Sequence, residues 1–207
     1  MPATRPRIVI AEDHTLVREG MRQLLADDFE VIAAVDDGRA LLAVAERLQP
    51  ALILLDISMP RLNGLDAARQ LAGVCPDSRL VFVTIHADPA YVQAAFAAGA
   101  HGYVLKSEAA SGLIAAMHEV LAGRRHLSPG LAGVERSPAV PEALTNRQRE
   151  ILQMVAEGRT AREIGEVLAI SHKTVEFHKA SIMRVLGLRS TADLTRYALA
   201  QGIIDPS

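Results

Sequence analysis

Five polar side chains that could carry out chemistry each follow a short apolar run of the sequence. They are Glu12 and Asp13 after the first run, Asp56 after the third, Thr84 after the fourth and Lys106 after the fifth. Clustered carboxylates supply the hard oxygen ligands that Mg²⁺ prefers, and a carboxylate can also act as a nucleophile that becomes an aspartyl phosphate. A lysine and a hydroxyl would position phosphoryl oxygens as charge develops on them. The set therefore indicates phosphoryl chemistry, provided that the fold brings its members together.

Each of these residues alone has an ordinary explanation. An acidic pair after a strand is usually a solvated loop or a helix cap, a lone threonine is a strand residue, and a lone lysine is a surface charge. Their occurrence after four different apolar runs favours a common site, because the ordinary explanations must otherwise all hold at once.

The apolar runs themselves are typical of strands that are buried on both faces, because they are short, continuous and rich in Val and Ile. They span residues 8–11, 31–35, 51–55, 80–83 and 102–105. Segments with a helical period separate them, which predicts βαβ crossovers. The expected fold class is a doubly wound α/β domain with a five-stranded parallel sheet and helices on both faces. Ligands of such sheets bind at the carboxyl ends of the strands.

The chain divides into three parts by composition. Residues 1–122 form the predicted α/β domain, and residues 123–141 are rich in Gly and Pro, which predicts an extended linker without regular elements. Residues 142–207 have a helical period throughout, and hydroxyl side chains precede the helical segments as candidate N-caps: Thr145, Thr160, Ser171 and Ser190. Two helices joined by a tight turn, at Ala169-Ile170, have the form of a helix-turn-helix.

Composition limits the class of protein. Half of the 207 residues are hydrophobic, which argues against disorder, and the single cysteine excludes an intramolecular disulfide framework or an all-Cys zinc site. No apolar run approaches the ~20 residues needed to span a bilayer, and the amino terminus lacks the apolar core of a signal peptide. We therefore expect a cytoplasmic protein with no membrane partner. Residues 123–207 carry 12 Lys and Arg against 9 Asp and Glu, so a polyanion is the candidate partner of this part.

The motifs of the first part resemble the receiver domain of two-component response regulators. The matching segments are Ile10-Ala11-Glu12-Asp13-His14, Leu55-Asp56-Ile57-Ser58-Met59-Pro60 with Asn63-Gly64, Val83-Thr84, and Gly102-Tyr103-Val104-Leu105-Lys106-Ser107. Glu12 departs mildly from the pattern, in which Asp is commoner at this position.

This resemblance implies a role for each polar residue. Asp56 would accept a phosphoryl group from a phosphohistidine on a sensor histidine kinase, and Thr84 and Lys106 would bind the phosphoryl oxygens. Thr84 and Tyr103 would form a switch pair, in which the hydroxyl moves toward the phosphate and the ring turns inward. A Mg²⁺ ion would be held by four groups: Glu12, Asp13, Asp56 and the backbone carbonyl of Ser58.

The carboxyl-terminal part resembles the LuxR-type helix-turn-helix, and the two parts together resemble the NarL/FixJ family. The segments that carry this second likeness include Leu144-Thr145-Asn146-Arg147-Gln148-Arg149-Glu150-Ile151-Leu152 and Ile170-Ser171-His172-Lys173-Thr174-Val175-Glu176-Phe177-His178. The resemblance implies binding to double-stranded promoter DNA, with a homodimer as the active form.

Spacing assigns roles along the expected recognition helix. Residues at core-facing intervals are predicted to pack inside the domain: Val175, Ile182, Val185 and Leu186. Residues that flank the outward face of the helix are predicted to contact mainly phosphates: Lys173, Thr174, His178 and Lys179. The outward residues between them are predicted to contact base edges: Glu176, Phe177 and Ala180. Glu176 could equally be an exposed surface charge. Four arginines could likewise contact the DNA backbone or belong to a solvated helix face: Arg147, Arg149, Arg159 and Arg162.

The interpretation is a transcriptional regulator and not an enzyme, apart from catalysis of its own phosphorylation and dephosphorylation. Two other classes remain open. An aspartyl-phosphate phosphatase would need a second acid two positions after the nucleophile, where Ser58 stands. A phosphorylation-independent DNA-binding regulator would use the receiver only as a scaffold for dimerisation or docking.

Overall fold

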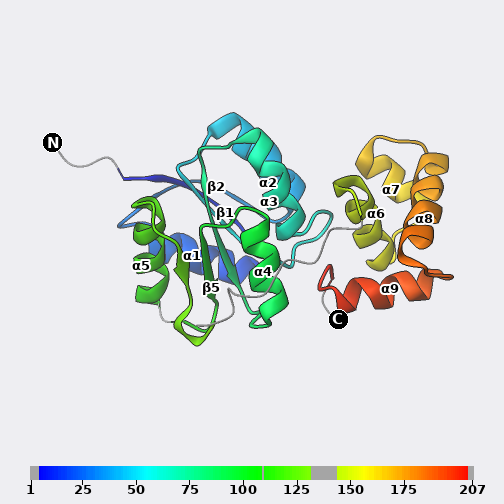
Figure 1. Cartoon of the computed structure of the whole chain (residues 1–207). Coiled ribbons are helices and arrows are strands. Elements are labelled where there is room, and N and C mark those ends of the chain that lie inside the picture. The colour runs from blue at the N-terminus through cyan, green and yellow to red at the C-terminus, as the bar shows by residue number, and fades with distance from the viewer. Residues whose placement is uncertain (1–4, 109, 132–143, 205–207) are drawn as a thin grey trace.

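The computed structural model describes residues 5–108, 110–131 and 144–204. Its first part contains a six-stranded parallel sheet with the strand order β2-β1-β3-β4-β5-β6 (Figure 1). The strands are β1 (Arg7–Ala11), β2 (Glu30–Val35), β3 (Leu52–Leu55), β4 (Arg79–Thr84), β5 (Gly102–Leu105) and β6 (His126–Leu127). The predicted doubly wound α/β class is confirmed.

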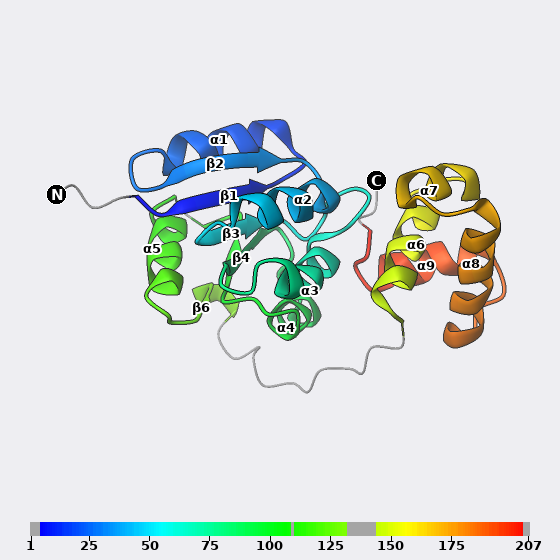
Figure 2. The ribbon, with the colours of Figure 1, turned by 90° about the horizontal axis from the view of Figure 1, so that it is seen from above.

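Helices cover both faces of the sheet (Figure 2). They are α1 (Thr15–Leu25), α2 (Gly38–Leu48), α3 (Gly64–Val74), α4 (Pro89–Ala97) and α5 (Ala110–Leu121). Ile8 and Ile10 pack into the core under α1 and α5, whereas Val9 and Ala11 pack into the core under α2, α3 and α4. Successive side chains of a strand point to opposite faces. A sheet with two buried faces therefore needs the continuous apolar runs seen in this sequence.

The order of the strands brings the polar residues together. β1 lies between β2 and β3, so the chain passes from β1 to β2 on one side and to β3 on the other side. Ala11 is paired with Leu55 at the carboxyl ends of β1 and β3. Glu12 and Asp56 follow these two residues directly and therefore leave the sheet at neighbouring points.

The sixth strand lies in the segment that we predicted to be a linker without regular elements. Residues His126–Leu127 pair with Gly102 and Tyr103 of β5, and the Ser128 amide donates to the Tyr103 carbonyl at 2.9 Å. The predicted number of five strands was therefore one too few, because a strand of two residues is too short to show a hydrophobic period. Residues 132–143 of the predicted linker lie outside the described residues.

The second part is a bundle of helices at the other end of the molecule (Figure 1). They are α6 (Asn146–Ala156), α7 (Ala161–Leu168), α8 (His172–Leu186) and α9 (Thr191–Ala200). The four predicted N-caps are confirmed, since each hydroxyl accepts a hydrogen bond from a backbone amide three residues on: Thr145, Thr160, Ser171 and Ser190. Each of the four helices contributes a buried residue to a common core: Ile151, Ile164, Ile182 and Leu194.

The first turn of α3 packs against the carbonyl of Asp56. A Cβ atom added at Gly64 would lie 1.9 Å from that carbonyl oxygen. We therefore expect Gly64→Ala to lower the free energy of unfolding by about 1–3 kcal/mol, as overpacking commonly does. Urea titrations measure this change. Gly73→Ala, in the same helix, is the matched control, because no atom lies within 4 Å of an added Cβ there. It should keep or raise stability. Equal effects of the two substitutions would contradict this account of the turn.

Candidate phosphoryl site and nucleic-acid interface

Three carboxylates meet at the carboxyl ends of β1 and β3. One ligand atom from each of Glu12, Asp13, His14 and Asp56 lies within 4.8 Å of the others. Asp56 is 4% exposed and Glu12 is 1% exposed, whereas Asp13 is partly open to solvent. The structure thus brings together the acids that the sequence predicted as one cluster.

Lys106 reaches this cluster from the end of β5. Its Nζ lies 2.6 Å from Asp56 Oδ2 and 2.7 Å from Glu12 Oε2. Burial by itself would lower the pKa of Lys106, but the charge of Asp56, its hydrogen bond to the ammonium and the charge of Glu12 outweigh this effect and hold the pKa above its usual value. Two buried acids therefore share one ammonium.

The cluster suits a hard divalent cation. Among the described residues, none donates a hydrogen bond of good geometry to the buried oxygens Glu12 Oε2 and Asp13 Oδ1, which are reached only by the ion pairs from Lys106 and His14. Carboxylate oxygens with spare acceptor capacity are the ligands that Mg²⁺ uses in proteins. Ser58 lies two residues after Asp56 in the same loop, where a backbone carbonyl could complete the set.

Thr84 and Tyr103 both contact His86, in the loop after β4. Thr84 is fully buried, and its Oγ1 accepts a hydrogen bond from the His86 amide at 3.4 Å. The Tyr103 hydroxyl donates to the His86 carbonyl at 2.8 Å, and burial, which is the main cause, raises the pKa of this phenol. The Tyr103 ring therefore lies inside the domain.

His86 also contacts the loop that follows Asp56. The sequence patterns did not predict this contact. Its Nε2 lies 2.9 Å from Ser58 Oγ, and its ring stacks on Tyr91 of α4 with the centroids 4.1 Å apart. Residues 58 and 86 lie on different strand-end loops, so no local pattern of the sequence connects them.

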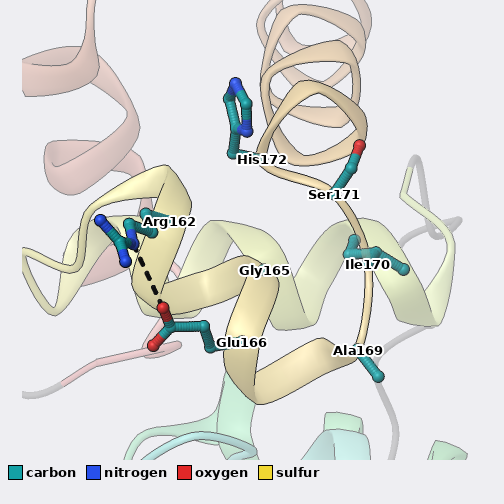
Figure 3. A pocket seen from close by; sticks show the side chains of 7 residues that line it. All are labelled: Arg162, Gly165, Glu166, Ala169, Ile170, Ser171 and His172. Atoms are coloured by element: carbon teal, nitrogen blue, oxygen red, sulfur yellow. Dashed lines mark hydrogen bonds and ion pairs between the residues drawn. The ribbon is translucent and has the colours of Figure 1, made fainter.

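The turn between α7 and α8 has the tight geometry of a helix-turn-helix (Figure 3). Ala169 has a positive φ of 52°, and the Ile170 amide donates to the Gly165 carbonyl at 3.0 Å. A Cβ atom at Gly165 would lie 2.7 Å from the Ile170 carbonyl oxygen, so only glycine fits this turn. The cap Ser171 then starts α8.

The α8 helix presents most of the predicted DNA-contacting residues to solvent. Phe177 is 70% exposed. The other exposed residues are Lys173, Glu176 and Ala180, and three are half-buried: Thr174, His178 and Lys179. Val175 and Ile182 are buried as predicted. The prediction that Val185 is a core residue was wrong: it is 49% exposed near the end of α8 and lies outside the buried cluster of the described helices, although the helical period continues there.

Arg149 fits neither interpretation that the sequence left open for it. Its side chain is buried, and its Nε lies 2.7 Å from Asp66 Oδ1 of α3. This contact joins the two parts of the chain, so Arg149 is part of a domain interface.

Comparisons with known proteins agree with both halves of the structure. The family model described as the response regulator receiver domain matches residues 8–118, and the model of bacterial regulatory proteins of the luxR family matches residues 142–198. The transcriptional regulatory protein MctR of Rhizobium johnstonii is 32% identical over 96% of this chain and 95% of its own. DegU of Brevibacillus brevis is 34% identical over 95% and 94%.

A solved structure of two RcsB dimers bound to two parallel DNAs matches the whole molecule. It has a TM-score of 0.61 and 25% identity, and the match covers 96% of this chain and 99% of the RcsB chain. The parallel sheet with its acidic cluster, followed by the helix-turn-helix, defines a DNA-binding regulator with a receiver domain. The chain belongs to the two-component response regulators that carry a LuxR-type DNA-binding domain. No helix in the described part of the chain is both long and apolar enough to cross a membrane.

The Lys106 ion pairs predict how stability depends on pH. The pKa of Lys106 is raised in the folded state, so the contribution of its charge is complete below the pKa of an unfolded lysine, about 10.4. That contribution is lost as the pH rises through the folded-state pKa. We expect Lys106→Met to lower the free energy of unfolding by about 3 kcal/mol at pH 8, and this difference from the wild type should shrink above pH ~10.5. Urea titrations across this range measure it, with Lys173→Met, an exposed lysine, as control. A difference that is constant with pH would contradict the assignment.

Proposed function

We propose that Asp56 accepts a phosphoryl group from a phosphohistidine of a sensor histidine kinase and that this controls binding to promoter DNA. The observation that carries the proposal is the position of Lys106 Nζ, within 2.7 Å of both Asp56 and Glu12. A buried nucleophilic carboxylate beside a fixed cation is the arrangement that phosphoryl transfer requires, because transfer depends on positioning and on neutralisation of charge.

In the proposed step, one Asp56 carboxylate oxygen forms a bond to phosphorus while the phosphorus–nitrogen bond of the phosphohistidine breaks. The imidazole leaves with the electrons of that bond. The Ile57 amide donates to Asp56 Oδ1 at 2.6 Å, and Lys106 contacts Oδ2, so both oxygens are held in place. Lys106 and the hydroxyl of Thr84 then bind the oxygens of the transferred group.

The carboxylates of Glu12, Asp13 and Asp56, with the Ser58 carbonyl, would hold Mg²⁺. When bound, this ion neutralises charge that develops on the phosphoryl oxygens. Its binding also offsets the repulsion between an incoming dianion and three neighbouring acids. Lys106 alone supplies one positive charge against that cluster, which is why we expect the reaction to depend on the cation.

The carboxyl-terminal domain is proposed to bind double-stranded DNA through α8, with a homodimer as the active form on a two-fold operator. The exposed residues Lys173, Glu176, Phe177 and Ala180 face away from the domain core, as the groove contact requires. We expect the protein to work in the cytoplasm, where promoter DNA and the kinase domain are both accessible.

A phosphorylation-independent regulator with a receiver scaffold is the competing function. One observation favours it: the receiver and the DNA-binding domain are joined by the buried ion pair of Arg149 with Asp66, which suits a docking scaffold. The two functions differ in whether Asp56 is modified at all.

Intact-mass measurement after incubation with acetyl phosphate distinguishes them. With Mg²⁺, the wild type should gain one phosphoryl group, whereas without Mg²⁺, or with Asp56→Asn, it should gain none, because cation and nucleophile are both required. Asp77→Asn is the control for loss of an acid elsewhere in the receiver. An adduct that persists in Asp56→Asn, or none in the wild type with either acetyl phosphate or a phosphorylated kinase, would contradict the proposal.

The assignment of phosphate contacts on α8 predicts a change in salt dependence. Lys173→Ala should weaken binding to a short duplex of random sequence and lower the slope of log K against log salt by about one, since one fewer counterion is released. Phe177→Ala should instead change the preference among duplexes of different sequence. Arg47→Ala removes one charge from the receiver and is the control. An unchanged slope for Lys173→Ala in fluorescence anisotropy titrations would overturn this assignment.

A further inference from the structure

The α8 helix carries a single acid among several cations. Its lysine and arginine residues are Lys173, Lys179 and Arg184, and its only acidic residue is Glu176. Lys173 precedes Glu176 by three positions and Lys179 follows it by three, so each lies within reach of Glu176 on the helix surface. A surface that binds DNA phosphates is expected to be basic. A carboxylate in the middle of this surface therefore needs an explanation.

Glu176 differs from the other acids of its domain because it has no partner. Residues 144–204 contain five other acids. Each of them forms an ion pair or accepts a hydrogen bond: Glu150, Glu157, Glu163, Glu166 and Asp193. Glu176 does neither with any residue that the structure describes, although Lys173 and Lys179 have the spacing for it. Both of its carboxylate oxygens are therefore open to a donor from outside the chain.

The position of Glu176 is one from which a recognition helix reaches the bases. It is the fifth residue of α8, which starts after the cap Ser171, and residues near the amino-terminal end of such a helix contact base edges in the major groove. Val175 before it is buried, whereas Glu176 and Phe177 are exposed. Both ribbon views show α8 on the far side of the bundle from the receiver (Figures 1 and 2). The receiver therefore leaves this side chain accessible to DNA.

A carboxylate in the major groove selects for bases that donate hydrogen bonds. An ionised Glu accepts hydrogen bonds and donates none. Guanine presents only the acceptors N7 and O6 in this groove, and thymine presents the acceptor O4 and a methyl group, so both repel a carboxylate. Adenine places its N6 donor beside the acceptor N7, whereas cytosine presents only its N4 donor. Cytosine is therefore the base that offers Glu176 an attractive partner without a repulsive one.

We propose that Glu176 recognises cytosine in the major groove, so that the protein selects DNA sites with this base beneath α8. The inference rests on the proposed function, because it needs α8 to enter the groove. The same carboxylate weakens binding to other sequences, since it is repelled by phosphates and loses water without gaining a hydrogen bond. Glu176 thus favours the right site and also penalises the wrong ones, and specificity depends on both effects.

Selection from a library of DNA duplexes with a random centre tests the proposal on the full chain. The wild type and Glu176→Gln are compared, each with and without acetyl phosphate and Mg²⁺, and the bound duplexes are sequenced. The sites selected by the wild type should share a cytosine at one position. Glu176→Gln should replace this preference by one for adenine, because a side-chain amide pairs with the N6 and N7 groups of adenine.

Fluorescence anisotropy with the selected duplex then measures the size of the effect. A deoxyuridine–adenine pair replaces the cytosine–guanine pair, which exchanges the N4 donor for an O4 acceptor without adding a methyl group that Phe177 could contact. The wild type should bind the substituted duplex about tenfold more weakly. The affinity of Glu176→Gln should change much less, because its amide can donate to the O4 acceptor.

Glu166→Gln is the matched control, because Glu166 is an exposed acid of α7 that pairs with Arg162 at 3.3 Å (Figure 3). It removes the same charge from the domain, so it should strengthen binding to all duplexes and keep the cytosine preference. Identical selected sites for the wild type and Glu176→Gln would overturn the assignment of Glu176 alone, as would loss of a preference for a base other than cytosine. Failure of the wild type to bind any duplex, with or without acetyl phosphate, would overturn the proposed binding to DNA and this inference with it.

Discussion

The ion pairs of Lys106 with Asp56 and Glu12 are the interaction on which the rest of the site depends. Two almost fully buried carboxylates would be costly without a cation between them, and Lys106 is held within 2.7 Å of both. The parallel sheet makes this possible, because it ends β1, β3 and β5 at one edge. In the proposed function the same ammonium binds the phosphoryl oxygens, so stability and the proposed chemistry would depend on one set of contacts.

The loop between β3 and α3 connects this site to the DNA-binding domain. Its start is tied to the sheet by Asp56, and Gly64 packs against the Asp56 carbonyl at its end. Between them, Met59 and Asn63 bond to Gln153 of α6. Hydrogen bonds and close packing therefore join the phosphoacceptor candidate to α6 through this one loop.

Much of this could be predicted from the sequence, for identifiable reasons. Continuous apolar runs indicate strands buried on both faces, and polar residues at their ends then meet at one edge, which located Asp56 and Lys106. Hydroxyl side chains at the N-cap positions predicted where each helix of the second domain begins. Contacts between distant elements could not be predicted, because Arg149 and Gln153 acquire their partners only when the domains dock. Val185 shows the limit of periodicity, since a repeat continues past the point where neighbouring helices stop covering it.

Chemical trapping of the acyl phosphate tests the central claim most directly, because it identifies the carboxylate that is modified. Borohydride reduces an aspartyl phosphate, and peptide mass mapping then locates the reduced residue. After phosphorylation in the presence of Mg²⁺, the account predicts reduction at Asp56 and at no other acid. Reduction at Glu12 or Asp13 would contradict it, because these two acids would then be nucleophiles rather than ligands of the cation.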